Sequence, residues 1–246
     1  MLQLATDYSE TDLLLIAAAV VPAVWLMIRV YRADRLEKEP AGLLLALLIL
    51  GVISTTLASL TEQLGDIALS WFYPEGTLPY DLIMYFVIVA FSEEGFKYLL
   101  LKLRTWNTPH FDCQFDGVVY AVFVSLGFAL WENIGYVMYY GLGAALARAM
   151  TAVPGHACFG VFMGYWYGIA KRWELAGYPD RSAGSRRWAL LVPALLHGCY
   201  DFIAVRQTEA LSTAFVVFVA AMFLVSNRLV SRLSRNDAYM RRPVDY

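Results

Sequence analysis

The chain has 246 residues, a formal net charge of −2, and a composition that is 59% hydrophobic and only 16% charged. Soluble domains are about 25% charged, so this composition excludes an ordinary soluble domain and indicates a membrane protein. The small net charge argues against a nucleic-acid partner, and the odd number of three cysteines argues against a disulfide framework.

The apolar residues form blocks that are long enough to cross a lipid bilayer, which takes roughly 20 residues of helix. Seven blocks follow one another with short connections, so we expect an all-α, polytopic membrane protein with a single transmembrane domain over residues 1–246. Their approximate ranges are 13–31, 41–63, 81–103, 117–140, 152–171, 187–205 and 210–228. Residues 65–80 contain aromatic residues that favour the membrane interface, and are expected to form a loop or short helix there.

The positions of lysine and arginine predict the orientation of these spans. With the N-terminus outside, only Arg148 and Arg206 of the 19 basic residues fall on the outer side. The others lie at or near the cytoplasmic face, although Lys97 lies within a span. Cytoplasmic segments of membrane proteins are enriched in these residues. We therefore expect the N-terminus outside and the C-terminus inside.

The connection between the first two spans, YRADRLEKEP at residues 31–40, carries three acids. We expect Asp34, Glu37 and Glu39 to be solvated loop charges. Pro40 is expected to begin the second span, because proline is favoured in the first turn of a helix.

The third span contains FSEEGFKYLL at residues 91–100. Ionisable residues within a span cost roughly 2.5–3.5 kcal/mol each and usually face the interior of a bundle. Glu93 and Glu94 lie four and three residues before Lys97, so either can meet the lysine, but they point about 100° apart. We expect Lys97 to neutralise one acid and leave the other, Glu93 by our preference, available to activate water.

The fourth and fifth spans carry small residues at every fourth position, a spacing that lets helices pack closely in lipid. Asp116 is expected to cap the fourth span. Asn133 ends one stripe of small residues and is expected to position water, stabilise an oxyanion or link helices. Glu132 points about 100° from it and is expected to be structural or to gate substrate. The stripes are Gly117, Ala121, Ser125, Ala129, Asn133 and His156, Gly160, Gly164, Gly168.

The sixth span contains His197 and, four residues later, Asp201, so the carboxylate can orient the imidazole. Counted along their helices, the polar groups of the third to sixth spans converge between the midplane and the outer leaflet. We therefore expect a water-filled cavity that opens to the outer side.

Two hydrolytic mechanisms fit these residue types. In the first, a glutamate acts as general base on water, histidines and Asn133 assist, and no cofactor is required. In the second, Glu93, His156 and His197 bind Zn²⁺, which activates the water. A transporter that relays protons through Glu and His is a third possibility, but the inverted repeats that would support it are not evident.

Several motifs resemble those of the PrsW family, in the family's order. They are E-E-x-x-K at 93–97, F-D-G-x-V-Y at 115–120, G-F-A-x-x-E-N at 127–133, H-A at 156–157 and H-G-x-Y-D-F at 197–202. Upstream, residues 34–40 are similar to the family's D-x-x-E-x-E-P segment.

This resemblance implies an intramembrane protease of a bacterial or archaeal cytoplasmic membrane that performs site-1 cleavage of a membrane-anchored protein such as an anti-sigma factor. It places the catalytic helices at about 81–205 and the catalytic residues at Glu93, Glu94, His156 and His197. Lys97, Asn133, Asp201 and Glu132 are then supporting residues. The wider group includes CAAX proteases, bacteriocin-processing proteins and non-catalytic scaffold or immunity-type proteins. A non-enzymatic membrane protein therefore stays the alternative, although the retained glutamate pair favours catalysis.

Overall fold

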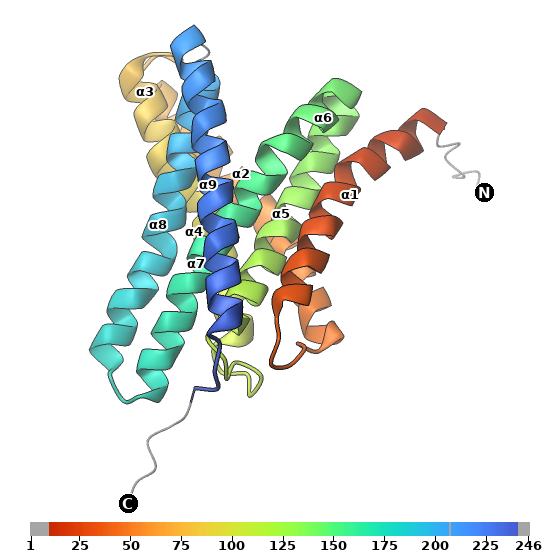
Figure 1. The fold of residues 1–246 in the computed structure, drawn as a ribbon. Coiled ribbons are helices and arrows are strands. Elements are labelled where there is room, and N and C mark those ends of the chain that lie inside the picture. Colours follow the sequence, from red (N-terminus) through yellow and green to blue (C-terminus); the bar gives the residue numbers. More distant parts are fainter. Residues whose placement is uncertain (1–9, 207, 241–246) are drawn as a thin grey trace, which may run out of the picture.

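The structure is a computed structural model that describes residues 10–206 and 208–240, and the regular elements within these ranges are all helices (Figure 1). The predicted all-α class is therefore confirmed for this part of the chain. The helices are α1 (Glu10–Ala33), α2 (Ala41–Ser70), α3 (Leu78–Ile83), η1 (Met84–Val89), α4 (Ala90–Thr105), α5 (Asp116–Tyr140), α6 (Leu142–Met150), α7 (Ala152–Leu175), α8 (Pro179–Val205) and α9 (Glu209–Arg235).

Five of these helices are long and apolar enough to cross a membrane: Leu14–Ala33 within α1, α2, α5, α8 and α9. They overlap five of the seven predicted spans. The remaining two predicted spans correspond to the segment formed by α3, η1 and α4, and to α7, which do not meet the same criterion of length and composition. Both segments carry charged side chains in the interior of the bundle, namely Glu93, Glu94 and Lys97 in α4 and Lys171 in α7.

Two connections differ from the sequence-based expectation. The second predicted span continues to Ser70, so residues 65–70 are helical rather than part of an interfacial loop, and only Leu78–Ile83 forms the expected short helix. The connection between α5 and α7 contains α6, which was not predicted. Gly141, with a φ of +79°, separates α5 from α6. Glycine reaches that conformation without the steric cost of a side chain.

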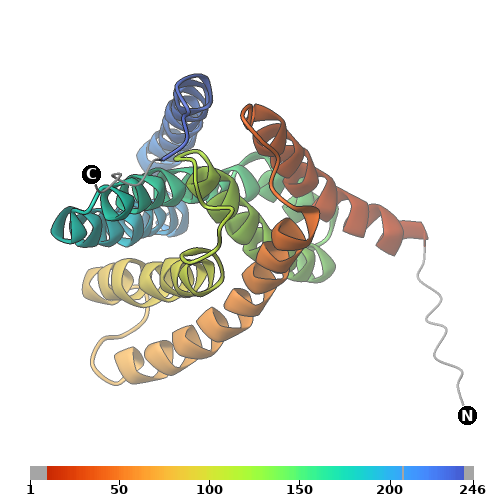
Figure 2. The same ribbon diagram turned by 90° about the horizontal axis from the view of Figure 1, so that it is seen from below.

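The small-residue stripes meet at the centre of the bundle, where α5 packs against α7 (Figure 2). A Cβ atom at Gly164 would lie 2.4 Å from the carbonyl oxygen of Gly117, and one at Gly168 would lie 2.3 Å from that of Gln114. A second close approach joins α2 to α5, where a Cβ at Gly51 would lie 2.2 Å from the carbonyl oxygen of Val124. The predicted role of small residues in helix packing is confirmed.

The helix that carries the glutamate pair is held differently. Figure 2 shows α4 between α2 and α8, and it packs on both. Immediately before it, η1 forms a π-helix, a feature often found near functional sites. There, Phe86 covers Gly198 of α8 and Ile88 covers Gly65 of α2. This segment therefore contacts its neighbours at these points through side chains rather than backbone.

We expect Gly164→Ala to destabilise the protein by at least about 1–3 kcal/mol, because the added methyl group meets backbone atoms that side-chain movement cannot relieve. Thermal unfolding of the purified protein in detergent measures this loss. Gly184→Ala in α8 is the matched control, since a Cβ there meets nothing within 4 Å. Equal losses in both variants would contradict the close-packing argument.

Candidate active site

Lys97 lies between the two adjacent glutamates in the interior of the bundle. Its Nζ atom is 3.1 Å from Oε2 of Glu93 and 2.8 Å from Oε1 of Glu94. Glu94 and Lys97 are completely buried, whereas the Glu93 side chain keeps 8% of its surface exposed. Spacings of three and four residues bring both carboxylates to the ammonium group, as predicted, but neither acid is left free of Lys97 as was expected.

His156 of α7 extends this arrangement to α5. Its Nδ1 atom lies 3.2 Å from Lys97 Nζ, and its Nε2 atom lies 3.0 Å from Oε2 of Glu132. Because an ammonium group only donates, Nδ1 must accept and Nε2–H must donate to the carboxylate. Glu132 thus reaches the site and fixes the tautomer of His156, although it points away from Asn133 on the helix.

His197 of α8 faces carboxylates with both ring nitrogens. Nδ1 lies 3.0 Å from Oε1 of Glu94, while Nε2 lies 3.3 Å from Oδ2 of Asp201 and 3.8 Å from Oε2 of Glu93. The ring also stacks on Phe159 with 4.7 Å between centroids. The predicted contact between His197 and Asp201 is confirmed, and the three acids hold the imidazole in one orientation.

Asn133 and Arg148 form the outer edge of the network. Arg148 of α6 donates to Oε2 of Glu132 at 2.7 Å and to Oδ1 of Asn133 at 2.9 Å, and the Asn133 amide donates to the Ala19 carbonyl of α1 at 2.9 Å. Asn133 is thus engaged with neighbouring helices, which favours the role of a helix link over contact with an oxyanion. Arg148 was not predicted as a site residue, because it was assigned to an external loop.

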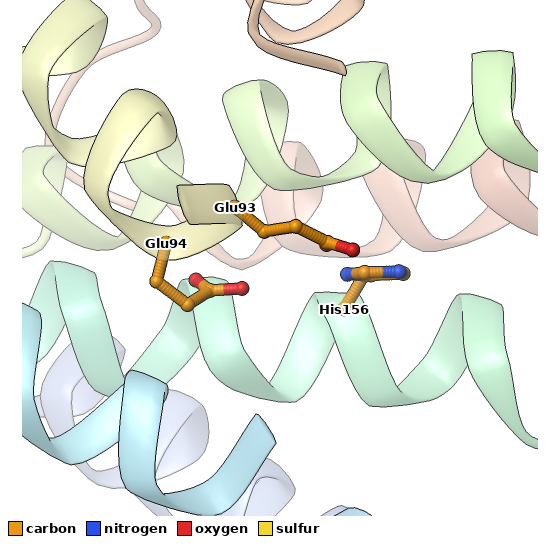
Figure 3. A group of neighbouring side chains, drawn as sticks. All are labelled: Glu93, Glu94 and His156. Carbon is orange, nitrogen blue, oxygen red and sulfur yellow. The ribbon is translucent and has the colours of Figure 1, made fainter. Parts of the chain in front are cut away.

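One potential metal-binding group occurs here. Glu93, Glu94 and His156 each offer a ligand atom, and these atoms lie within 4.8 Å of one another; Figure 3 shows the Glu93 side chain reaching from α4 toward His156. Two carboxylates and an imidazole are suitable donors for Zn²⁺. The group contains Glu94 rather than His197, which was expected in the metal set. The Lys97 ammonium group already bonds to all three residues, so a bound metal would require it to move.

A cavity of about 430 Å³ lies beside this network, lined by residues of α2 and α5 that include Thr55, Ser59, Glu132 and Tyr136. Of the predicted site residues, only Glu132 lines it. Glu62 of α2 also interacts electrostatically with Glu93 and Glu132, and its Oε1 atom is buried without a hydrogen-bond partner among the described residues. Glu62 was not predicted as a site residue, although an acid in the last turn of an apolar span was a signal.

The helices and these contacts define a multi-pass membrane protein with a buried acid–base centre built from four helices, α4, α5, α7 and α8. The four predicted catalytic residues all belong to one connected set of hydrogen bonds and ion pairs.

Comparisons with known proteins agree with this class. Residues 39–226 match the model of the PrsW family, described as "PrsW family intramembrane metalloprotease". Curated proteins named "Protease PrsW" are similar over most of their length. The one from Shouchella clausii is 32% identical over 90% of this chain and 97% of its own, and the one from Bacillus subtilis is 33% identical over 77% and 82%. No solved structure matches at a significant level.

The chain therefore belongs to the PrsW family of intramembrane proteases. The resemblance in the sequence motifs is confirmed, and the chain is a bacterial-type, multi-pass membrane protein of a protease family.

We expect Lys97→Met to destabilise the protein by about 3–5 kcal/mol, because it leaves buried carboxylates without their cation. Thermal unfolding in detergent measures the loss, and adding Glu94→Gln to Lys97→Met should recover part of it. Lys102→Met, on the same helix but outside the network, is the control. A wild-type unfolding temperature for Lys97→Met would show that the ammonium group does not stabilise the site.

Proposed function

We propose that this protein is an intramembrane endopeptidase in which a glutamate activates water for hydrolysis of a peptide bond. The observation that carries the proposal is the convergence of Glu93, Glu94, His156 and His197 around one lysine in the core of a membrane protein. Such groups are expensive within a membrane and are usually retained for function. The family match supports proteolysis within the membrane.

Within the pair, Glu93 is the proposed general base. Its side chain keeps some exposed surface, and its contact with Lys97 is longer than that of Glu94. Glu94 is completely buried between Lys97 and His197, so it is suited to positioning these two groups rather than to meeting water. Glu93 would take a proton from water, and the water oxygen would attack the carbonyl carbon of the substrate.

The neighbouring groups have complementary roles. Lys97 and His197 are donors that can stabilise negative charge on the attacked carbonyl oxygen or return a proton to the leaving amine. Asp201 orients His197, and Glu132 with Arg148 orients His156. The cavity at Glu132 between α2 and α5 is the proposed approach for water or substrate.

We further propose that the chain crosses the membrane seven times, with its N-terminus outside and C-terminus in the cytoplasm. The distribution of lysine and arginine supports this orientation. The two additional spans would be residues 78–105 and α7, whose polar groups face the bundle interior. The single transmembrane domain over 1–246 stays a prediction, and its ends lie outside the described residues.

The proposed substrate is a membrane-anchored protein, cut near the extracytoplasmic side. Site-1 cleavage of an anti-sigma factor is the specific activity that the motif resemblance implies. The location of the glutamate–histidine centre within the bundle is consistent with a substrate that is itself held in the bilayer.

A metal-dependent form of the same reaction is the second candidate. The donor group formed by Glu93, Glu94 and His156 favours it, as does the description of the matched family. These three residues would hold the ion once Lys97 had moved aside, and a bound Zn²⁺ would activate water as a Lewis acid. His197 and Asp201 would remain beside the ligands to exchange protons with substrate.

We expect Glu93→Gln to lower the rate of cleavage by roughly 10²–10⁴-fold, since the amide cannot accept the proton from water. The assay is cleavage of a membrane-anchored anti-sigma factor, reconstituted with the purified protein in vesicles. Glu94→Gln should also lose activity, and Glu75→Gln in the exposed turn after α2 is the control. Wild-type cleavage by both glutamate variants would contradict the proposed function.

Treatment with a chelator separates the two mechanisms. We expect cleavage to continue after the treatment, because the glutamate mechanism requires no ion. A loss of cleavage that Zn²⁺ restores would instead assign the reaction to the metal-dependent form. The same vesicle assay serves for both measurements, with chelator saturated by Ca²⁺ as the control for nonspecific effects.

A further inference from the structure

A second group of acids lies at the end of the bundle where α1 ends and α5 begins, shown at the bottom of Figure 1. Asp34 follows α1, Glu39 precedes α2, and Asp116 is the first residue of α5. The expectation that Asp34 and Glu39 are solvated is wrong, since they are 2% and 3% exposed, and Asp116 is 1% exposed. One carboxylate oxygen from each residue lies within 4.8 Å of the other two.

These carboxylates are incompletely satisfied. Tyr120 donates to Oε2 of Glu39 at 2.7 Å, and Oδ2 of Asp116 accepts from the backbone of Asp112 and Cys113. The expected capping role of Asp116 is thus replaced by contacts with the preceding loop. In the described part of the chain, the second oxygens of all three acids, Asp34 Oδ2, Glu39 Oε1 and Asp116 Oδ1, are buried without a hydrogen-bond partner. A buried acceptor in this state is costly.

Positive charge from the protein balances the group only in part, through the attraction between Lys38 and Asp34. None of the ion pairs formed within residues 10–206 and 208–240 includes Asp34, Glu39 or Asp116. Lys38 is close, but its ammonium group donates to the backbone carbonyls of Tyr31 and Asp34.

From these contacts we infer that Asp34, Glu39 and Asp116 form a binding site for a hard divalent cation, Ca²⁺ or Mg²⁺, separate from the catalytic centre. Hard cations take oxygen ligands and are commonly bound by several carboxylates. The cation would satisfy the unpartnered oxygens and offset the mutual repulsion of the three acids. The site uses none of the residues proposed for catalysis, so it stands independently of the proposed function.

The position of the site gives the cation a structural role. Its ligands come from the connection between α1 and α2 and from the start of α5, so one ion would join three helices. The C-terminal segment is attached to the same region, because Met240 donates to the Asp112 carbonyl and Asp237 accepts from the Phe115 backbone. Cys113 lies beside Asp116 in an overlapping group that would suit a softer metal, and the experiment includes that outcome.

The test is thermal unfolding of the full-length protein in detergent after removal of metals with a chelator. We expect CaCl₂ or MgCl₂, at about 100-fold excess over its dissociation constant, to raise the unfolding temperature by roughly 5 °C. KCl at equal ionic strength should have no such effect. An unchanged unfolding temperature, together with no saturable Mn²⁺ binding detected by electron paramagnetic resonance, would overturn the inference.

Variants locate the ion. Asp34→Asn and Glu39→Gln should lose the cation-induced shift while unfolding in metal-free buffer at the wild-type temperature or above, because each removes a repelling charge. Glu37→Gln, in the same loop but outside the group, is the matched control and should keep the shift, as should Glu93→Gln.

Loss of the shift in Glu93→Gln alone would assign the ion to the catalytic centre. Stabilisation by Zn²⁺ alone, abolished by Cys113→Ser, would assign a thiolate site. Either result would overturn the inference.

Discussion

The interaction on which the site depends is the burial of one ammonium group among two carboxylates and an imidazole. Lys97 is fully buried, contacts Glu93, Glu94 and His156, and lies 3.8 Å from the centre of the Phe128 ring. Removing the ammonium group would leave both carboxylates without a cation in an apolar interior, which costs far more than an intact pair contributes. The polar residues of α4, α7 and α8 therefore form one unit rather than separate defects in apolar helices.

Close packing of the neighbouring helices makes this unit possible. Glycines bring the backbone of α5 against α7 and against α2, which fixes Glu132 and His156 relative to one another. Because both ring nitrogens of His156 are engaged, its orientation follows from positions set by the backbone. The close contact between α5 and α7 therefore both packs the small residues and positions Glu132 and His156 for the proposed catalysis.

Much of this could be predicted from the sequence, because helical spacing determines which side chains of one helix meet. Spacings of three or four residues predict the contacts of Lys97 with the glutamates and the contact of His197 with Asp201. The same spacing of glycines predicts the close packing of α7 against α5. Contacts between helices could not be predicted in this way. Arg148 of α6 and Glu62 of α2 join the site from segments whose place in space depends on the fold, and Asp34 and Glu39 were assigned to solvent because a loop sequence does not reveal what covers it.

Helices that touch through their backbones and helices that touch through side chains differ in how freely they can move. Two backbones in direct contact can separate only as whole helices, whereas contacts made by Phe86 and Ile88 can change through rotation of side chains. The α5–α7 pair is therefore a fixed frame that carries Glu132 and His156. The side-chain contacts of η1 leave the segment that leads into α4 more freedom than this frame, so we expect any adjustment to a bound peptide to come from the helix that carries Glu93, Glu94 and Lys97.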